Sequence, residues 1–240
     1  MRAGSQPCSM TLTPSLEADR ALKADPTFVK TWVHGWAMTR EVAPPEPDSG
    51  ALRVEVGWPE QKRRYVFHRL SDDVLRLAER IREPWILLKV CAPWDWVQPI
   101  LPPGWVIPAP GYMMARDLAP ANERTLPAGY AFEFDSRLPL TVAYVKTAAG
   151  EVAATGRLGL VEGPIGRLAV FDRIRTHEDH RRQGLARALM TRLGNIALAN
   201  GFDRAALVAT PEGRLLYSAL GWRLHSLYTT ALIPGPQTSS

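Results

Sequence analysis

The residues with the clearest chemical potential form a short polar turn at the start of an amphipathic segment. The turn and the residues after it combine positive charge with small side chains: Arg181, Arg182, Gln183, Gly184, Leu185, Ala186 and Arg187. The first N–H groups of a helix lack partners within the helix and carry partial positive charge. They suit a phosphate or pyrophosphate, which Gly184 and Ala186 would let approach the backbone closely. The alternative is an ordinary helix start whose arginines face water.

Other phosphate-binding or metal-binding patterns do not explain this turn. The sequence has no Gly-x-x-x-x-Gly-Lys-Ser/Thr loop, and no Gly-x-Gly-x-x-Gly loop follows a predicted strand. His177 and His180 enclose two acidic residues, but the pattern is not His-Glu-x-x-His and lies in a polar turn. Cys8 and Cys91 make neither a disulfide framework nor a metal site. We therefore expect a solvated loop at residues 177–180 and no metal.

The composition bounds the class of protein. The chain has 240 residues, of which 46% are hydrophobic and 22% charged, so it can bury the core of one large domain or two lobes. No apolar run is long enough to span a bilayer, and residues 1–16 lack the apolar stretch of a signal peptide. Cytoplasmic location is therefore the expectation. The net charge of +5 attracts anions, but without a nucleic-acid motif we expect neither nucleic acid nor membrane as a partner.

The C-terminal half is predicted to place the polar turn between a long strand and a helix. Alternating or apolar runs predict strands, and apolar residues at helical spacing predict helices. The expected order is three strands (140–146, 152–160 and 165–176), a helix (184–200), a strand (204–209), a short helix (212–220) and one or two strands (222–233).

The N-terminal half shows a similar but weaker pattern. Strands are predicted at 52–56, 64–68, 85–90 and 112–115, with a helix at 71–81. A Gly-Trp pair precedes the last strand in both halves, at Gly104-Trp105 and at Gly221-Trp222. This echo suggests two lobes of similar topology, unless a few residues match by chance. We expect an N-terminal lobe at 1–118 and a C-terminal domain at 119–240.

The turn resembles a loop of a known superfamily. Arg181-x-x-Gly184-x-Ala186, after a strand and before an amphipathic helix, looks like the acyl-CoA pyrophosphate loop of the GCN5-related N-acetyltransferase (GNAT) superfamily, Gln/Arg-x-x-Gly-x-Gly/Ala. A second block, Thr210 to Trp222, is similar to the family pattern Asn-x-x-Ala-x-x-Leu-Tyr-x-x-x-Gly-Phe. The resemblance implies an α+β mixed sheet of the GNAT, or acyl-CoA N-acyltransferase, fold. The N-terminal lobe would be a degenerate GNAT-like lobe, because it lacks this loop.

The resemblance also implies a reaction and its residues. It implies an acetyl-CoA-dependent N-acetyltransferase in which a primary amine of a small molecule or peptide attacks the thioester directly. The strand end would hold the pantetheine arm, a backbone N–H near Ile174 would polarise the carbonyl, and Tyr217 would protonate the departing thiolate. Thr210 replaces the common asparagine, which weakens its match. The cofactor-binding residues implied are Ile174, Arg175, Thr176, Arg181, Arg182, Gln183, Gly184, Leu185, Ala186, Arg187, Thr210 and Tyr217.

The general base is less determined. By strand alternation, Leu168, Val170 and Asp172 share one face. The position where some relatives carry a glutamate aligns near Val170, which cannot accept a proton. Asp172 is the nearest carboxylate on that face and is the predicted base. The alternatives are an ion pair between Asp172 and a neighbouring arginine, a water chain, or a role for His225.

The amine acceptor is not identified by the sequence. Seven of the eight tryptophans precede residue 110, and we expect them mainly in the core, with an acceptor pocket as the alternative. Asp95, between Trp94 and Trp96, suits either an amine or a solvated turn. A rival function is an acetyl-CoA-binding sensor or pseudoenzyme with a regulatory N-terminal lobe. The chain is expected to be a monomer or a homodimer.

Overall fold

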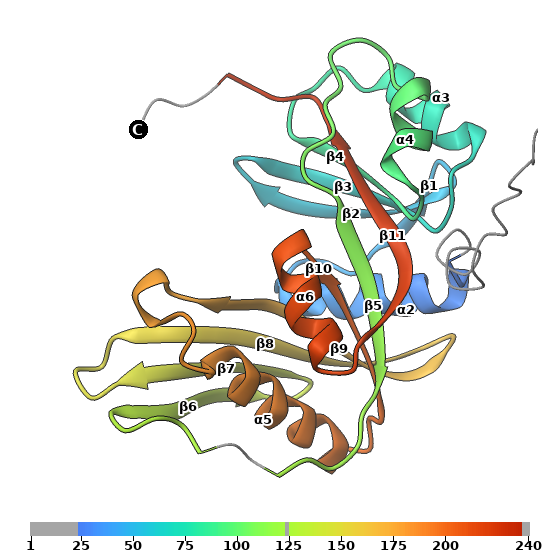
Figure 1. Ribbon diagram of the computed structural model, residues 1–240. Coiled ribbons are helices and arrows are strands. Elements are labelled where there is room, and N and C mark those ends of the chain that lie inside the picture. The colour runs from blue at the N-terminus through green and yellow to red at the C-terminus, as the bar shows by residue number, and fades with distance from the viewer. Residues whose placement is uncertain (1–23, 123–124, 237–240) are drawn as a thin grey trace, which may run out of the picture.

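The chain forms one mixed sheet of eleven strands flanked by helices (Figure 1). The computed structural model describes residues 24–122 and 125–236. The expectations for residues 1–16 and Cys8 lie outside this part of the chain. None of the helices that the structure describes is long and apolar enough to cross a membrane.

In the N-terminal half, residues 24–117 contain five strands and three α-helices. They are α2 (Pro26–Thr39), β1 (Glu46–Asp48), β2 (Ala51–Trp58), β3 (Gln61–Phe67), α3 (Asp72–Arg80), β4 (Ile86–Val90), α4 (Trp94–Val97), the 3₁₀ turn η1 (Gln98–Ile100) and β5 (Gly111–Asp117).

The C-terminal half contributes six strands and two α-helices. They are β6 (Tyr130–Arg137), β7 (Leu140–Thr147), β8 (Val152–Gly163), β9 (Gly166–Thr176), the 3₁₀ turn η2 (Glu178–His180), α5 (Leu185–Ala199), β10 (Arg204–Ala209), α6 (Pro211–Ala219) and β11 (Arg223–Leu232). The predicted helices and strands of this half are therefore present within a few residues of their expected bounds.

The two halves exchange their last strands. The sheet order is β1-β2-β3-β4-β11-β5-β10-β9-β8-β7-β6, so β11 lies beside β4 and β5 lies beside β10. Counted outward from the centre, β11-β4-β3-β2 and β5-β10-β9-β8 repeat one pattern: antiparallel, parallel, antiparallel. The similar topology suggested by the Gly-Trp echo is thus present, and an ancient duplication stays a prediction. The boundary proposed between residues 118 and 119 falls between β5 and β6 and also stays a prediction.

Helix α2, which the sequence analysis did not predict, crosses one face of the sheet beneath both halves (Figure 1). Its start is well specified, because the Asp25 side chain accepts from the first-turn N–H groups and Pro26 occupies the first turn. Its Trp32 and Trp36 are 2% and 3% exposed, as expected for core tryptophans. At Gly35 the helix touches the sheet so closely that a Cβ atom would lie 2.4 Å from Val170 Cγ2.

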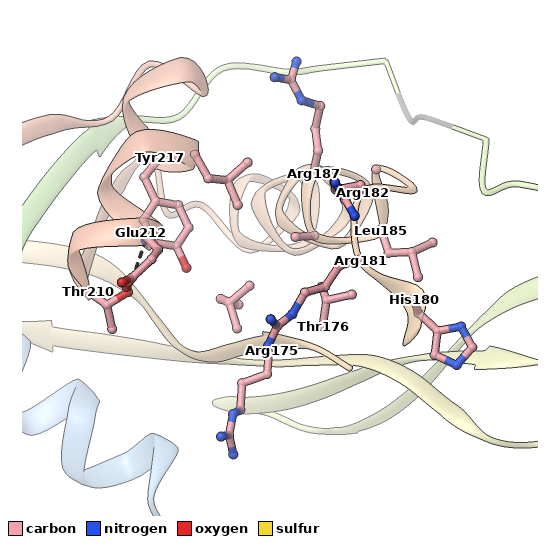
Figure 2. A pocket seen from close by; sticks show the side chains of 15 residues that line it. Arg175, Thr176, His180, Arg181, Arg182, Leu185, Arg187, Thr210, Glu212 and Tyr217 are labelled. Atoms are coloured by element: carbon pink, nitrogen blue, oxygen red, sulfur yellow. Dashed lines mark hydrogen bonds between the residues drawn. The ribbon is translucent and has the colours of Figure 1, made fainter. Parts of the chain in front are cut away.

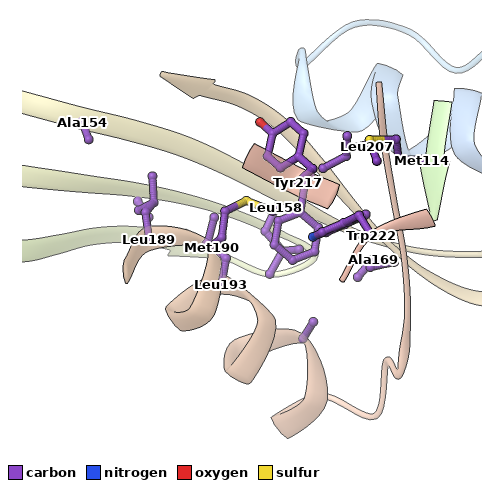
Figure 3. Close-up of a cluster of buried hydrophobic side chains, with 14 of the residues drawn as sticks. Met114, Ala154, Leu158, Ala169, Leu189, Met190, Leu193, Leu207, Tyr217 and Trp222 are labelled. Carbon is purple, nitrogen blue, oxygen red and sulfur yellow. The ribbon is translucent and has the colours of Figure 1, made fainter. Parts of the chain in front are cut away.

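Helix α5 covers the other face of the C-terminal strands. Leu189 and Leu193 are fully buried against Leu158 of β8 and Ala169 of β9 (Figure 3). Trp222 joins the same cluster, with its ring edge against Phe171 at 5.3 Å between centroids. The strands are therefore buried on both faces, which fixes the register of β8 and β9 at the site.

Two expectations about the N-terminal half are corrected. Trp94 and Trp96 are each 51% exposed, because they lie on the four-residue helix α4 and not in the core. Trp85 was expected in a strand, but it has a left-handed backbone (φ 67°) and β4 begins at Ile86. Its N–H is nevertheless paired, donating to the carbonyl oxygen of Ile233 at 3.0 Å.

Candidate active site

The site begins where two parallel strands separate. β9 and β10 pair only at Ala169 with Ala205 and at Val170 with Ala206. Beyond this point β9 continues to Thr176 and β10 continues to Ala209, without pairing to each other. The backbone N–H and C=O groups on the two separated edges need other partners, which a ligand lying between the strands can supply.

A bulge in β9 turns its residues toward two sides of the sheet. Arg157 on β8 pairs with Asp172, whereas Thr155 pairs with Arg175, so β9 carries one extra residue between these pairs. Arg173 takes a left-handed conformation there, with φ 52°. This conformation costs a residue with a side chain about 1–2 kcal/mol. Backbone strain of this kind persists where the surrounding structure enforces it, and it is concentrated at functional sites.

The bulge separates three neighbouring side chains. Asp172 and Arg173 both face the α2 side, where Asp172 contacts Arg40 and the Arg173 guanidinium lies 4.5 Å from the ring centroid of Trp58. Ile174 faces the α5 side and packs on the core cluster there. Without the bulge, strand alternation would have placed Arg173 on the α5 side.

A cavity of about 890 Å³ opens on the α5 side of the separated strands (Figure 2). We call it the donor cavity. Every residue predicted to bind the cofactor lines it except Gln183. The lining residues are Ile174, Arg175, Thr176, His180, Arg181, Arg182, Gly184, Leu185, Ala186, Arg187, Thr210, Glu212, Gly213, Leu216 and Tyr217.

Four of these lining residues were not predicted. Glu212, Gly213 and Leu216 lie on α6, the same helix as Tyr217. Their helical spacing from Tyr217 could have predicted that they face the same space. His180 had no such signal. Its Nδ1 atom lies 2.8 Å from the hydroxyl of Tyr130 on β6, a contact that ties the turn before α5 to the sheet. In the described part of the chain, no group of three His, Cys, Asp or Glu side chains could hold a metal ion.

The start of α5 offers free backbone donors to the donor cavity. Its N-cap residue Gly184 has φ 79°, and no side chain caps it. A Cβ atom at Gly184 would meet nothing within 4 Å, so the backbone is open to an approaching group. Arg182 is also left-handed, with φ 61°. First-turn N–H groups without a capping side chain, at the positive end of a fifteen-residue helix, are suited to binding an anion.

Tyr217 closes the opposite end of the donor cavity. It projects from α6, is 8% exposed, and points its hydroxyl into the cavity (Figure 2). Burial, and secondarily the charge of Asp172, raise the pKa of Tyr217 to about 12. The hydroxyl is therefore protonated at neutral pH and available as a donor. Thr210 begins the same helix, and its Oγ1 accepts from the N–H of Gly213 at 3.1 Å.

Comparison with known proteins agrees with this geometry. The profile of the acetyltransferase (GNAT) domain matches residues 139–224. The chain carries a GNAT domain. A GCN5-related N-acetyltransferase from Kribbella flavida shares 14% identity, with a TM-score of 0.61, over 85% of this chain and 95% of its own. A GNAT-family acetyltransferase from Novosphingobium aromaticivorans shares 16%, with a TM-score of 0.53, over 87% and 97%. No curated protein matches the sequence.

These two structures share the fold over nearly the whole chain. Because the matched regions extend well beyond residues 139–224, the likeness includes N-terminal strands as well as the GNAT domain. The mixed α+β sheet of the GNAT fold, expected from the sequence, is confirmed.

Asp172 of the GNAT domain is engaged in an ion pair. Its Oδ1 accepts from Arg40 Nη2 at 2.9 Å, and its Oδ2 accepts from Arg40 Nε and from Thr39 Oγ1 at 3.1 Å. The Arg40 and Asp172 side chains are only 16% and 14% exposed. This is the ion-pair alternative that the sequence analysis left open. His225 stacks on Phe28 at 4.1 Å and is not among the residues lining the donor cavity.

Two further cavities lie on the α2 side of the GNAT domain, beyond Asp172. The inner cavity, of about 210 Å³, shares Thr210 with the donor cavity and is lined by Asp172, Arg40 and residues of both halves. The outer cavity, of about 600 Å³, includes Arg40 and Arg175, the latter also lining the donor cavity. The site is therefore bordered by a donor cavity on one side of β9 and by basic cavities on the other.

Proposed function

We propose that this protein transfers an acetyl group from acetyl-CoA to a primary amine of a small molecule or peptide. The observation that carries the proposal is the donor cavity, in which an uncapped helix start, an open strand edge and the Tyr217 hydroxyl face one space. These features suit a pyrophosphate, an extended amide-containing arm and a leaving thiolate, in that order.

The reaction follows from these positions. The neutral amine nitrogen attacks the thioester carbonyl carbon, a C–N bond forms, and the C–S bond breaks with its electron pair on sulfur. The nitrogen loses one proton and the sulfur gains one, so the products are an amide and a free thiol. Tyr217, which remains protonated because burial raises its pKa to about 12, donates the proton to sulfur. A bulge N–H at Ile174 is proposed to stabilise the oxyanion.

The amine is proposed to arrive from the α2 side. Asp172 lines the inner cavity, and Thr210 lines both the inner cavity and the donor cavity. A base at Asp172 remains a proposal, since its two oxygens accept from Arg40 and Thr39. A water molecule held near Asp172 is the alternative carrier of the ammonium proton.

Two measurements test the proposal together. Acetyl-CoA should raise the melting temperature, because a ligand that binds only the folded state stabilises it by mass action. A panel of primary amines, followed by release of free CoA, should then show turnover. Absence of any melting shift at millimolar acetyl-CoA would refute the cofactor assignment. Gly184→Glu is the matched variant, since it places a carboxylate where the pyrophosphate should bind.

A second candidate function has one observation in its favour. Both oxygens of the Asp172 carboxylate already accept hydrogen bonds from Arg40 and Thr39, so the carboxylate is engaged before any amine arrives. This favours an acetyl-CoA-binding sensor with no turnover. The two functions separate cleanly: the sensor predicts the melting shift with acetyl-CoA and no CoA release across the amine panel. Cytoplasmic location and a monomeric or homodimeric state also stay predictions.

A further inference from the structure

The inner cavity is lined by hydrogen-bond donors that lack acceptors. Three buried polar atoms on its walls make no well-formed hydrogen bond among the described residues: the indole Nε1 of Trp32, the Nε of Arg64 and the hydroxyl of Tyr228. The Arg64 guanidinium and the Tyr228 hydroxyl lie close enough to interact with each other. Trp32 is 2% exposed, Arg64 7% and Tyr228 3%. Each can donate a hydrogen bond, and a buried donor left without an acceptor is costly.

The three donors converge from different parts of the chain. Trp32 lies on α2, Arg64 on β3 and Tyr228 on β11, and the Trp32 and Tyr228 rings meet edge to face at 5.6 Å. The Arg64 guanidinium lies 3.7 Å from the ring centroid of Trp36, which fixes its plane. Because each group is held by packing, the donor set is preorganised before any ligand arrives.

The lining of the inner cavity also contains more basic than acidic side chains. Arg40, Arg64 and Lys89 line it, whereas Asp172 is the one acidic side chain in its lining. Asp172 is already used by Arg40, so Arg64 and Lys89 have no carboxylate partner there. Lys89 Nζ donates to the hydroxyl of Thr230 at 2.7 Å, which supplies no charge. Burial and the charges of Arg64 and Arg40 lower the pKa of Lys89 well below its usual value, so an anion bound beside Lys89 would favour its charged form.

The donors and basic side chains of the inner cavity determine which kind of ligand group it can bind. Indole, phenol, guanidinium and ammonium groups are all donors, so the complementary group is an acceptor rich in lone pairs and negatively charged. A carboxylate or a phosphate meets both requirements, whereas a neutral amine or an apolar group meets neither. The volume of about 210 Å³ admits a small molecule and excludes a folded peptide segment.

We infer that the inner cavity binds an oxyanionic group of the acetyl acceptor, which is a small primary amine carrying a carboxylate or a phosphate. The inference rests on the proposed function for the amine and on the donor set for the oxyanion. The oxyanion lies among Arg64, Lys89 and Tyr228, and the amine extends past Asp172 toward the donor cavity, with which the inner cavity shares Thr210.

The first test compares matched amines at fixed acetyl-CoA. β-Alanine is paired with β-alaninamide, and O-phosphoethanolamine with ethanolamine, and CoA release gives kcat/KM for each. The oxyanionic member of at least one pair should be favoured roughly 10-fold to 100-fold, the range expected for hydrogen bonds to a charged group. Preference for the first pair identifies a carboxylate and preference for the second a phosphate. Equal kcat/KM within both pairs, with turnover present, would overturn the inference and leave acetyl transfer intact.

The second test does not need turnover. Inorganic phosphate and propionate, titrated at constant ionic strength, should raise the melting temperature of the wild type but not of Arg64→Gln. Arg63→Gln is the matched control, since Arg63 is the adjacent residue on β3, pairs with Glu55 and is 35% exposed. If Arg64→Gln fails to fold, Lys89→Met carries the same prediction. Anion stabilisation without CoA release supports the oxyanion site and refutes acetyl transfer. Anion shifts that are equal in wild type, Arg64→Gln and Arg63→Gln would refute the site.

Discussion

Asp172→Asn tests whether the carboxylate acts as an ion-pair partner. Asparagine keeps the shape of Asp172 but removes the charge that faces Arg40, leaving a guanidinium that is only 16% exposed without its carboxylate. Removing one partner of a buried pair costs about 3–5 kcal/mol, whereas exposed pairs contribute roughly 0.2–1 kcal/mol. The pair is mostly buried and doubly hydrogen-bonded, and Arg40 also keeps its contacts 5.2 Å from the Trp36 and Trp58 rings.

We therefore expect Asp172→Asn to lower the free energy of unfolding by about 3 kcal/mol, toward the lower end of the buried range. For a chain of this length, that corresponds to a melting temperature lower by about 6–12 °C. Urea unfolding followed by circular dichroism measures the change, with an unaltered m-value as the check on two-state behaviour. Asp135→Asn is the control, because its pair with Arg137 is exposed and should change stability by no more than roughly 0.5 kcal/mol.

A double-mutant cycle isolates the pair. The losses for Arg40→Met and Asp172→Asn should not add, since either change alone already breaks the contact. An unfolding midpoint for Asp172→Asn equal to that of the wild type would refute the ion-pair reasoning. If turnover were then also lost at every pH, Asp172 would regain its assignment as the general base.

Three further predictions concern other parts of the site and its support. Tyr217→Phe should lower kcat at least roughly 10-fold while acetyl-CoA binding persists. The pKa of Tyr217 is about 12 in the folded protein and 10 in the unfolded chain, so the free energy of unfolding of the wild type should decrease as the pH rises from 10 through 12. The variant lacks this hydroxyl and should not show that decrease. Gly184→Glu should abolish the acetyl-CoA melting shift, whereas Gly184→Ala, which meets no atom, should cost only about 1–2 kcal/mol of left-handed strain. Gly35→Ala should lower stability by about 1–2 kcal/mol through overpacking against Val170, whereas Gly194→Ala, whose Cβ would meet nothing closer than 3.8 Å, should raise it by about 0.5–1 kcal/mol in urea unfolding.

The donor cavity was predictable because its parts are local in sequence. The strand that ends at Thr176, the turn at Gly184 and the helix that follows are consecutive, so their order alone brings them together. Tyr217 lies on the second helix after the turn, α6, and the predicted strand and helix between them were also read from the sequence. Helix α2 left a local signal too, in the Asp25 cap and the buried Trp32 and Trp36, and it was missed.

The α2 side was not predictable, because its contacts depend on strand order. Asp172 meets Arg40 across 132 residues of chain, and Lys89 meets Thr230 across 141. The contact of Lys89 reflects the placement of β11 beside β4, and the contact of Asp172 reflects the packing of α2 on β9. No alternation of apolar residues specifies either arrangement. Trp94 and Trp96 show a different limit of sequence analysis. Tryptophan is usually buried, but these two lie on a single helical turn between prolines and are exposed.

The exchange of last strands constrains how the chain can be made. During synthesis β5 emerges before any of its sheet neighbours, since β10 and β11 are the last strands of the chain. The backbone groups of β5 and the fully buried Met113 therefore remain uncovered until β10 and β11 are synthesised, which takes about half of the chain. A fragment ending at residue 118 would expose both edges of β5. A fragment beginning at residue 119 would lack β5 as a partner of β10 and both partners of β11. The central part of the sheet therefore forms only after β10 and β11 have left the ribosome.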